Sequence, residues 1–324
     1  MRRKREYMKQ GKKITILGAG NVGATIAYAL AIDAIASEIV LIDINKDKAK
    51  GEAMDIYQGT SFTRSVSVYD GEYADAKDSD IVVIAVGSAR KPGQSRIDLA
   101  QGNVNIIKSV MPQVIQYAPH AVYVVVSNPV DILTYAILKV TGLPVNQVIG
   151  SGTTLDSSRL RARIADIVGL TPQNVHAYVF GEHGDSAMIP WSLTSIAGMP
   201  MTTFCEQVRR EQPSFSQEEL KGIEDDVRNS GAKVISLKGA TYYAIGTTVR
   251  YICENILRDS GSLMTVSGLM KGQYGMEDVC LSLPCTVGAS GIREFLEPPL
   301  TAEETAKLLH SAEVLKSTIS SLEI

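Results

Sequence analysis

Short apolar runs rich in β-branched residues recur through the first half of the sequence, separated by longer stretches with helical periodicity. The runs fall at residues 14–17, 38–43, 80–86 and 121–126. IVVIAV and VYVVV do not alternate apolar with polar residues, so they predict strands buried on both faces, as in a parallel sheet covered by helices. Because crossovers between parallel strands are right-handed, the sequence predicts a doubly wound α/β domain.

The rhythm changes after about residue 152, where a second, α+β architecture is expected. Helices are predicted near residues 157–168, 217–237 and 302–320, and strands around 175–180. Between the last two helices, runs such as EDVCLSLPCTVG are broken by glycine and charged residues, which predicts an antiparallel meander. No Pro/Gly-rich linker divides the halves, so we expect two domains that share a packed interface and a cleft.

Composition excludes several classes of protein. The 324 residues are about twice the length of one ordinary domain. An apolar fraction of 45% and a charged fraction of 21% exclude disorder, and no apolar run approaches the roughly 18 residues of a membrane-spanning helix. The four cysteines form no CxxC pair and lack zinc-type spacing to histidine, so neither a disulfide framework nor a metal site is expected.

Basic residues are concentrated at the N-terminus. Residues 1–13 hold seven Lys or Arg against Glu6 alone, which leaves 25 bases against 34 acids in the rest of the chain. We interpret this run as a solvated terminus; the alternative is a nucleic-acid-binding arm. The apolar run that follows reaches a glycine loop after four residues, so no secretory signal is expected and the predicted location is the cytoplasm.

The glycine loop GAGNVG occupies residues 18–23, directly between the first predicted strand and an apolar helix. Gly18 permits the tight turn, Gly20 lets the backbone approach a pyrophosphate, and Gly23 lets the helix pack closely, so the phosphates would meet the helix N-terminus. A second strand ends in Asp43, 20 residues past Gly23, where a carboxylate accepts hydrogen bonds from ribose hydroxyls. This combination predicts a Rossmann-type dinucleotide site.

Asp43 also favours NAD over NADP, because a carboxylate repels a 2′-phosphate and no arginine follows it directly. Lys46 and Lys48 weaken that preference slightly. The expected organisation is therefore a basic N-terminal extension, an NAD-binding domain and a substrate-binding α+β domain, at residues 1–13, 14–152 and 153–324.

His183 is the candidate acid or base, because it lies in GEHGD, a glycine-flanked turn after an apolar strand. A core histidine of no special role is the alternative. In LDSSR, Asp156 and Arg159 share one helical face, so Asp156 could orient the imidazole while Arg159 binds a substrate carboxylate. An ordinary surface ion pair is the alternative that spacing leaves open.

A polar loop with three positive charges, GSARKPGQSR, follows the third buried strand at residues 87–96. Doubly wound folds bind ligands at this end of the sheet. Proline and glycine suit a hinged lid, and the positive charges suggest an anionic substrate. A solvated loop is the alternative.

Together these motifs resemble the lactate/malate dehydrogenase family along nearly the whole chain, from GAGNVG through SNPVD, LDSSR and GEHGDS to LKGATYYAIG. By that resemblance the protein would be an NAD-dependent L-2-hydroxy acid dehydrogenase and a homo-oligomer, expected to be a tetramer. His183 would exchange the proton, with Asp156 as its partner and Arg159 binding the carboxylate. Arg96 would be the lid residue that polarises the carbonyl, and Asn128 a further carbonyl contact preceding a cis bond to Pro129.

The resemblance also implies the residues that contact the cofactor and the substrate. Cofactor contacts are implied at Gly18, Gly20, Val22, Gly23, Asp43, Lys48, Tyr73, Gly87, Ser88, Ser127 and Asn128, and a substrate contact at Thr241.

The sequence gives opposing indications of the substrate. Arg90, six residues before Arg96, resembles the malate branch, because an arginine there pairs with the second carboxylate of oxaloacetate. Glu182, Thr241 and Ile245 resemble the lactate branch. The leading interpretation is L-lactate dehydrogenase that also accepts oxaloacetate; the alternative is malate dehydrogenase, and a more remote one is a catalytically silent NAD-binding protein.

Arg161 and His176 resemble the pair that binds fructose 1,6-bisphosphate between subunits of bacterial lactate dehydrogenases. The alternative is a helix ion pair and a strand-end histidine with no such role. Neither nucleic acid nor membrane is an expected partner.

Overall fold

The computed structural model describes residues 11–88, 93, 95–208 and 214–324. Six neighbouring strands run parallel in the spatial order β6-β5-β4-β1-β2-β3, so the strand order reverses between β1 and β4. Ligands of doubly wound sheets bind outside the carboxyl ends of the strands at such a reversal. The strands are β1 (Lys13–Leu17), β2 (Glu38–Ile42), β3 (Ser67–Asp70), β4 (Ile81–Ile84), β5 (Val122–Val125) and β6 (Val148–Gly150).

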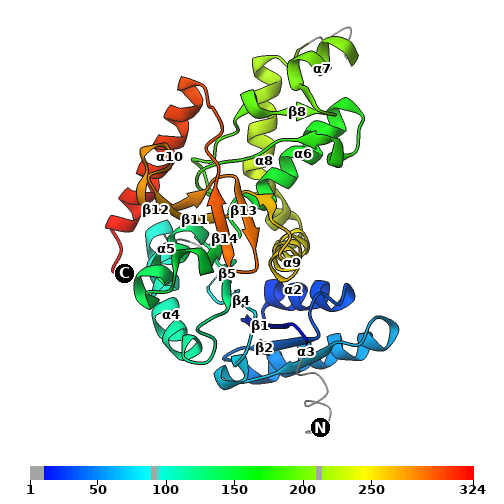
Figure 1. Ribbon diagram of the computed structural model, residues 1–324, viewed down its shortest axis with the longest axis vertical. Helices are drawn as coiled ribbons and strands as arrows, with labels where there is room; N and C mark the ends of the chain where they lie inside the picture. Colours follow the sequence, from blue (N-terminus) through cyan, green and yellow to red (C-terminus); the bar gives the residue numbers. More distant parts are fainter. Residues whose placement is uncertain (1–10, 89–92, 94, 209–213) are drawn as a thin grey trace.

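Helices cover both faces of this sheet, as the continuous apolar runs predict (Figure 1). Alternate residues of β4 illustrate it: Val82 and Ile84 pack with α4 and α5, whereas Ile81 and Val83 pack with α2, α3 and α9. Successive side chains of a strand point to opposite faces of the sheet, so the residues of each strand alternate between two hydrophobic cores. The helices are α2 (Asn21–Ile32), α3 (Lys46–Gly59), α4 (Arg96–Ile115), α5 (Val130–Thr141) and α9 (Tyr243–Leu257).

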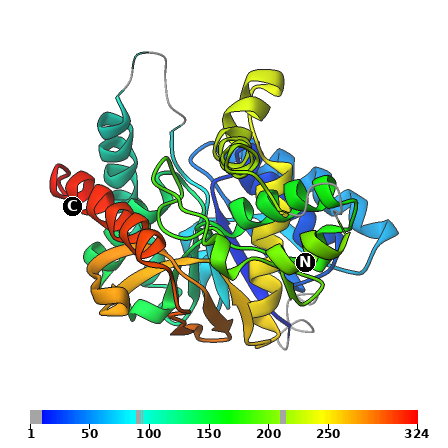
Figure 2. The same cartoon turned by 90° about the horizontal axis from the view of Figure 1, so that it is seen from above.

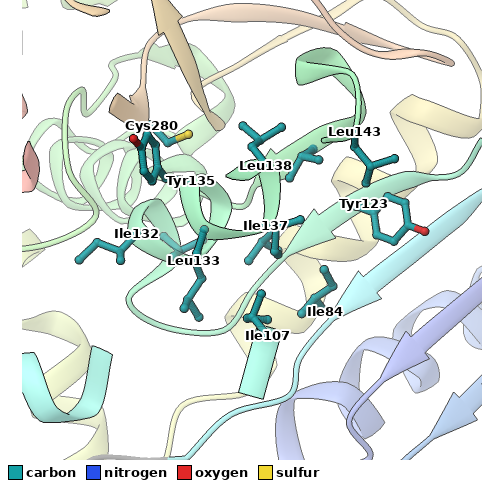
Figure 3. Close-up of a cluster of buried hydrophobic side chains, with 14 of the residues drawn as sticks. Ile84, Ile107, Tyr123, Ile132, Leu133, Tyr135, Ile137, Leu138, Leu143 and Cys280 are labelled. Carbon is teal, nitrogen blue, oxygen red and sulfur yellow. The ribbon is translucent and has the colours of Figure 1, made fainter. Parts of the chain in front are cut away.

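The core beneath α4 and α5 reaches into the C-terminal half of the chain. Figure 3 shows Ile107 of α4 and Ile137 of α5 beside Ile84 and Tyr123 of the sheet, with Cys280 at the far end of the cluster. Tyr123 is fully buried, and its hydroxyl donates to the carbonyl oxygen of Ala118 at 2.9 Å, which satisfies its polar end.

A separate part of the C-terminal half carries its own core (Figure 1). The expected strand at 175–180 is only two residues long, and this expectation was wrong in its extent. After His176 the backbone no longer pairs with the neighbouring strand. The N–H of Val179 donates to Ser157 Oγ at 2.9 Å, and Phe180 pairs with Met188 in an isolated bridge. These elements are α6 (Thr154–Val168), β7 (Val175–His176), β8 (Ser195–Ile196), β9 (Met199–Pro200), α7 (Met201–Val208) and α8 (Gln217–Lys238).

The expected meander is divided between two sheets, which corrects the prediction of one unit. β11 (Ser267–Lys271) and β12 (Glu277–Ser282) extend the parallel sheet antiparallel beside β6, with Ser267 opposite Gly150. They cover the open edge that β6 would present to solvent. The remaining strands, β10 (Ser262–Met264), β13 (Cys285–Gly288) and β14 (Gly291–Phe295), form a three-stranded sheet.

The last helix, α10 (Ala302–Ser320), begins where the sequence predicts, at a capping box of Thr301 and Glu304. It lies against β12 and α5 (Figure 1 and Figure 2). None of the helices in the described part of the chain has the length and apolar character needed to cross a membrane. Short 3₁₀ turns occur at Thr60–Phe62, Tyr73–Ala76, Val145–Gln147, Pro172–Asn174, Trp191–Leu193 and Gln273–Gly275.

Candidate active site

The glycine loop is packed so tightly that two of its glycines admit no side chain. A Cβ on Gly18 would lie 2.6 Å from the Ala85 carbonyl oxygen, and φ there is +99°. A Cβ on Gly23 would lie 1.8 Å from the Gly18 carbonyl oxygen. A Cβ on Gly20, in contrast, would meet nothing within 4 Å, so open space lies over the middle of the loop. The loop therefore leaves room for a ligand at the N-terminus of α2.

Asp43 holds this loop in place from the carboxyl end of β2. Its Oδ2 accepts from the backbone N–H of Ala19 at 2.6 Å, and its Oδ1 accepts from that of Asn45 at 2.8 Å. Each carboxylate oxygen accepts more than one hydrogen bond, so both retain capacity for ribose hydroxyls. The N-terminus of α2 has no side-chain cap, which leaves its amides for an anion. These residues fit the adenosine and pyrophosphate parts of NAD.

Two further residues predicted to contact the cofactor lie near Asp43. Tyr73 begins a 3₁₀ turn; burial and then the charges of Glu72 and Asp43 raise the pKa of its hydroxyl. Lys48 is exposed near the start of α3, where its backbone N–H donates to the Asn45 cap at 3.1 Å.

A buried asparagine joins the loops after β4 and β5. Asn103 Oδ1 accepts from the N–H of Ser88 at 2.8 Å, and Asn103 Nδ2 donates to the Asn128 carbonyl at 2.7 Å. Ser127 Oγ donates to the carbonyl oxygens of Val86 and Ile84. The predicted residues Gly87, Ser88, Ser127 and Asn128 are thus brought together, and the Asn128-Pro129 bond is cis, as the resemblance implied. Sequence reasoning missed Asn103, although a polar residue on the apolar Ala100/Val104/Ile107 face of a helix was a usable signal.

His183, Asp156 and Arg159 form one hydrogen-bonded group. Asp156 Oδ2 lies 2.5 Å from His183 Nδ1, and Asp156 Oδ1 accepts from Arg159 Nη1 at 2.8 Å. One turn of α6 separates the aspartate from the arginine, which explains why a single carboxylate reaches both partners. Because Nδ1 is engaged, Nε2 is the imidazole nitrogen left for another partner.

Opposite charges dominate the ionisation of this group. Burial disfavours the ionised form of Asp156, but the charges and hydrogen bonds of His183 and Arg159 outweigh it and hold its pKa below the usual value. Burial likewise disfavours a charged imidazole, but Asp156, and to a smaller extent Asp131, raise the pKa of His183 above its usual value. The site thus favours an imidazolium facing a carboxylate.

The group opens into a cavity of about 350 Å³ between α6, α8 and the glycine loop. His183 is 28% exposed, whereas Asp156 is 10% exposed, so the histidine presents itself to the cavity and the aspartate lies behind it. The predicted site residues that line this cavity are Val22, Asn128, Asp156, Arg159, His183 and Thr241.

The two lid arginines are placed differently. Arg96 begins α4, and its Nη1 lies 2.6 Å from Asp185 Oδ2, with both side chains more than two-thirds exposed. Asp185 lines the cavity and follows His183 by two residues, so Arg96 is held at the cavity rim. Arg90 lies outside the described residues.

Arg161 lies on α6 and His176 on the neighbouring β7, and neither lines the cavity. Arg161 Nε donates to the carbonyl oxygen of Ala177 at 2.9 Å, and the guanidinium lies 5.0 Å from the centre of the Tyr178 ring. His176 is exposed, directly before Ala177. Within the described ranges, no group of three or more His, Cys, Asp or Glu side chains is arranged to hold a metal ion.

Comparison with known proteins gives matches along nearly the whole chain. A family profile described as lactate/malate dehydrogenase, NAD binding domain, matches residues 12–150, and one described as the alpha/beta C-terminal domain of the same family matches residues 153–323. L-lactate dehydrogenase 1 of Clostridium acetobutylicum is 47% identical over 315 residues, covering 97% of this chain and 100% of that protein. The L-lactate dehydrogenase of Acetivibrio thermocellus is 46% identical over 313 residues, covering 97% and 98%.

The solved structures agree with the sequence matches. The minor L-lactate dehydrogenase of Enterococcus mundtii superimposes with a TM-score of 0.92 at 37% identity, covering 97% of this chain and 99% of that one. These matches agree with the fold, with the glycine loop and its aspartate, and with the His–Asp–Arg group on one cavity. The chain therefore belongs to the lactate/malate dehydrogenase family.

Proposed function

We propose that the protein is an NAD-dependent L-lactate dehydrogenase that interconverts pyruvate and L-lactate. The observation that carries the proposal is the His183–Asp156–Arg159 group, which offers a protonated imidazole and a guanidinium to one cavity beside the glycine loop. Two relatives at 46–47% identity over nearly the full chain carry the name L-lactate dehydrogenase, which supports pyruvate as the substrate.

In this proposal NAD, when bound, accepts or supplies the hydride, and the protein's residues perform the rest. Arg159 binds the substrate carboxylate through the donors that Asp156 leaves free, because a guanidinium has five N–H groups and Asp156 is bonded to Nη1. His183 gives its Nε2 proton to the substrate oxygen during reduction and takes it back during oxidation. Asp156 fixes the tautomer by holding Nδ1 and favours the charged form.

Arg96 has a separate role in the same proposal. It stabilises the negative charge that develops on the carbonyl oxygen, as a cation placed where that charge forms. Its present partner, Asp185, lies two residues beyond His183, so an exchange from Asp185 to substrate would bring Arg96 over the cavity. The carbonyl oxygen would then lie among Arg96, His183 and Asn128.

Oxaloacetate is the second candidate substrate, because the sequence has arginine at position 90. A guanidinium in the substrate pocket would lack a partner beside the pyruvate methyl, whereas the second carboxylate of oxaloacetate would supply one. NADH oxidation by the purified protein tests both candidates: pyruvate should give the higher kcat/KM, and oxaloacetate a measurable one. Arg90→Gln should lose oxaloacetate activity selectively, with Arg64→Gln as an exposed arginine control. Equal losses on both substrates would contradict a recognition role for Arg90.

Self-association belongs to the proposal as well. Large apolar side chains are exposed on three adjacent helices, α2, α3 and α9: Tyr28, Ile32, Met54, Tyr57, Tyr243 and Tyr251. Exposed apolar side chains on adjacent helices support an interface with a second copy. We expect a homotetramer, and light scattering on the eluting protein distinguishes it from a dimer or a monomer.

Effector control is proposed for Arg161 and His176. The bond to Ala177 holds Arg161 beside the exposed His176, which supports a shared anion site for fructose 1,6-bisphosphate between subunits. Adding the bisphosphate should lower the KM for pyruvate, and Arg161→Gln should abolish that response. An unchanged KM for pyruvate in the wild-type protein on addition of the bisphosphate would contradict this proposal.

We also propose a cytoplasmic location, a domain boundary near residue 152, and no nucleic-acid role for the basic extension.

A further inference from the structure

Asp131 is a buried carboxylate beside the candidate active site, and the proposed mechanism gives it no role. It is 2% exposed and is the second residue of α5, three positions after Asn128. Its Oδ2 accepts from the backbone N–H of His183 at 2.8 Å. One short segment therefore carries both Asn128 and the group that holds the main chain of His183.

A carboxylate is a costly way to satisfy one backbone N–H. An asparagine oxygen accepts the same hydrogen bond without a buried charge, and removing a charge from water is expensive unless it is compensated. Oδ1 of Asp131 has no hydrogen-bond partner of good geometry among the described residues, and neither has Oγ of the nearby Ser267. Burial raises the pKa of Asp131 to about 6, and Ser267 is the strongest group that opposes this rise.

Besides Ser267, three features compensate the charge of Asp131. The N-terminus of α5 places backbone amides and a positive helix end near it. His183 lowers its pKa both through the backbone hydrogen bond and through the imidazolium charge, whereas the neighbouring Glu182 raises it. A charge kept next to the catalytic histidine in this way has an electrostatic consequence for that histidine.

We propose that Asp131 is a positioning residue for His183: its carboxylate holds the backbone of the His183 turn against the segment that carries Asn128, and supplies a second negative charge beside the imidazole. Among the described residues, the charged groups around His183 and its cavity come from four helices and its own turn: Asp156 and Arg159 from α6, Asp131 from α5, Glu224 and Arg228 from α8, Arg96 from α4, and Glu182 and Asp185 from the turn. Asp156 acts directly on Nδ1, and Asp131 acts from behind the main chain. The inference deepens the proposed function and rests on it for the catalytic role of His183.

The test measures the titration of His183 in the ligand-free protein by NMR. The chain has four histidines, and His120, His176 and His310 are exposed, so they serve as internal references; the His183→Gln variant assigns the fourth signal. Asp131→Asn keeps an acceptor for the His183 N–H and removes the charge. We expect the His183 midpoint to fall by about 0.5–1 pH unit, with the three references unmoved.

Kinetics supply the second measurement. The alkaline limb of kcat/KM for pyruvate should move to lower pH by the same amount in Asp131→Asn, with KM changed less than kcat. Asp131→Ala also removes the acceptor, so its kcat should fall further than that of Asp131→Asn. Asp278→Asn is the matched control: its exposed carboxylate accepts from Tyr135 and Lys139 farther along α5, and the profile should stay in place.

Ser267→Ala keeps the proposal testable should Asp131 variants fail to fold, because loss of the Ser267 hydroxyl weakens the ionised form of Asp131 and should lower the His183 midpoint. A midpoint of His183 that is unchanged in Asp131→Asn, with only the melting temperature reduced, would overturn the proposal and leave Asp131 a structural residue. The NMR result is independent of turnover. A lowered midpoint in a protein that does not reduce pyruvate would support the role of Asp131 in positioning and contradict the proposed function instead.

Discussion

Asp156 accepts from two partners with different oxygens: Oδ2 lies 2.5 Å from His183 Nδ1, and Oδ1 lies 2.8 Å from Arg159 Nη1. The proposed proton donor and the proposed carboxylate-binding residue are therefore positioned by one buried side chain. A change at Asp156 should consequently affect both proton transfer and substrate binding, whereas a change at either partner should affect mainly one of them.

The pH dependence follows from the raised pKa of His183. Pyruvate reduction needs the imidazolium, so kcat/KM should be constant below the pKa of His183 and should fall about tenfold per pH unit above it. Asp156→Asn removes the charge that favours the imidazolium, so the fall should begin at lower pH. Lactate oxidation needs the neutral imidazole and should show the opposite limb. Asp278→Asn, which removes an exposed carboxylate paired with Lys139 on α5, is the control; equal shifts in both variants would contradict the assignment.

Arg159→Lys should impair substrate binding more than folding. Lysine keeps the positive charge but loses the planar fork that binds a carboxylate through two hydrogen bonds. Breaking a desolvated charge-assisted contact costs about 2–5 kcal/mol, so kcat/KM for pyruvate should fall by about 30-fold or more, chiefly through KM. Arg163→Lys, on the same helix but in an exposed pair with Asp226, should change it little. An unchanged KM in Arg159→Lys would mean that another cation binds the carboxylate.

Asp43→Ala should weaken NADH binding. It removes the acceptor for Ala19 and Asn45 as well as the proposed ribose contact, and hydrogen bonds to a charged group contribute about 1.5–3 kcal/mol each. We expect a rise in the Kd for NADH of at least about tenfold, measured by fluorescence titration. Asp43→Asn, which keeps one acceptor oxygen, should lie between wild type and Asp43→Ala. Tighter binding of NADPH in both variants would support electrostatic exclusion of the 2′-phosphate.

Two glycine substitutions in neighbouring helices should have opposite effects on stability. Gly23→Ala places a Cβ 1.8 Å from the Gly18 carbonyl oxygen, so α2 must shift, and we expect a loss of about 1–3 kcal/mol in the free energy of unfolding. Gly51 lies within α3 with nothing within 4 Å of an added Cβ, so Gly51→Ala should gain up to about 1 kcal/mol from helix propensity. Urea unfolding measures both; a neutral Gly23→Ala would mean that the close packing of α2 is unnecessary.

Local sequence patterns predicted the parallel sheet well. Continuous apolar runs identify strands buried on both faces: β2, β4 and β5 lie within the predicted runs, and β1 begins one residue before its run. The helix at 302–320 also has a strong local signal, because Thr301 and Glu304 form a capping box. Pairing between strands that are distant in the sequence has no such local signal. β11 and β12 join the sheet beside β6 because Ser267 pairs with Gly150, which lies more than a hundred residues earlier.

In the candidate site, too, the residues with a local sequence signal were predictable, and the contacts between distant segments were not. His183, Asp156 and Arg159 are recognisable because their residue types and spacing already indicate proton transfer and carboxylate binding. Asn103 and Asp131 act through main-chain groups of distant residues, Asn128 and His183 respectively, and main-chain groups leave no residue pattern. The ion pair of Arg96 with Asp185 also depends on tertiary structure alone.

The most direct test of the account is steady-state NADH oxidation by the purified protein with pyruvate. The same assay is run on His183→Gln, and the Kd for NADH is measured for both proteins. We predict pyruvate-dependent turnover by the wild-type protein and a loss of kcat of about 100-fold or more in the variant, with the Kd for NADH unchanged. Tight NADH binding without pyruvate turnover in the wild-type protein would contradict the account and would indicate a catalytically silent NAD-binding protein.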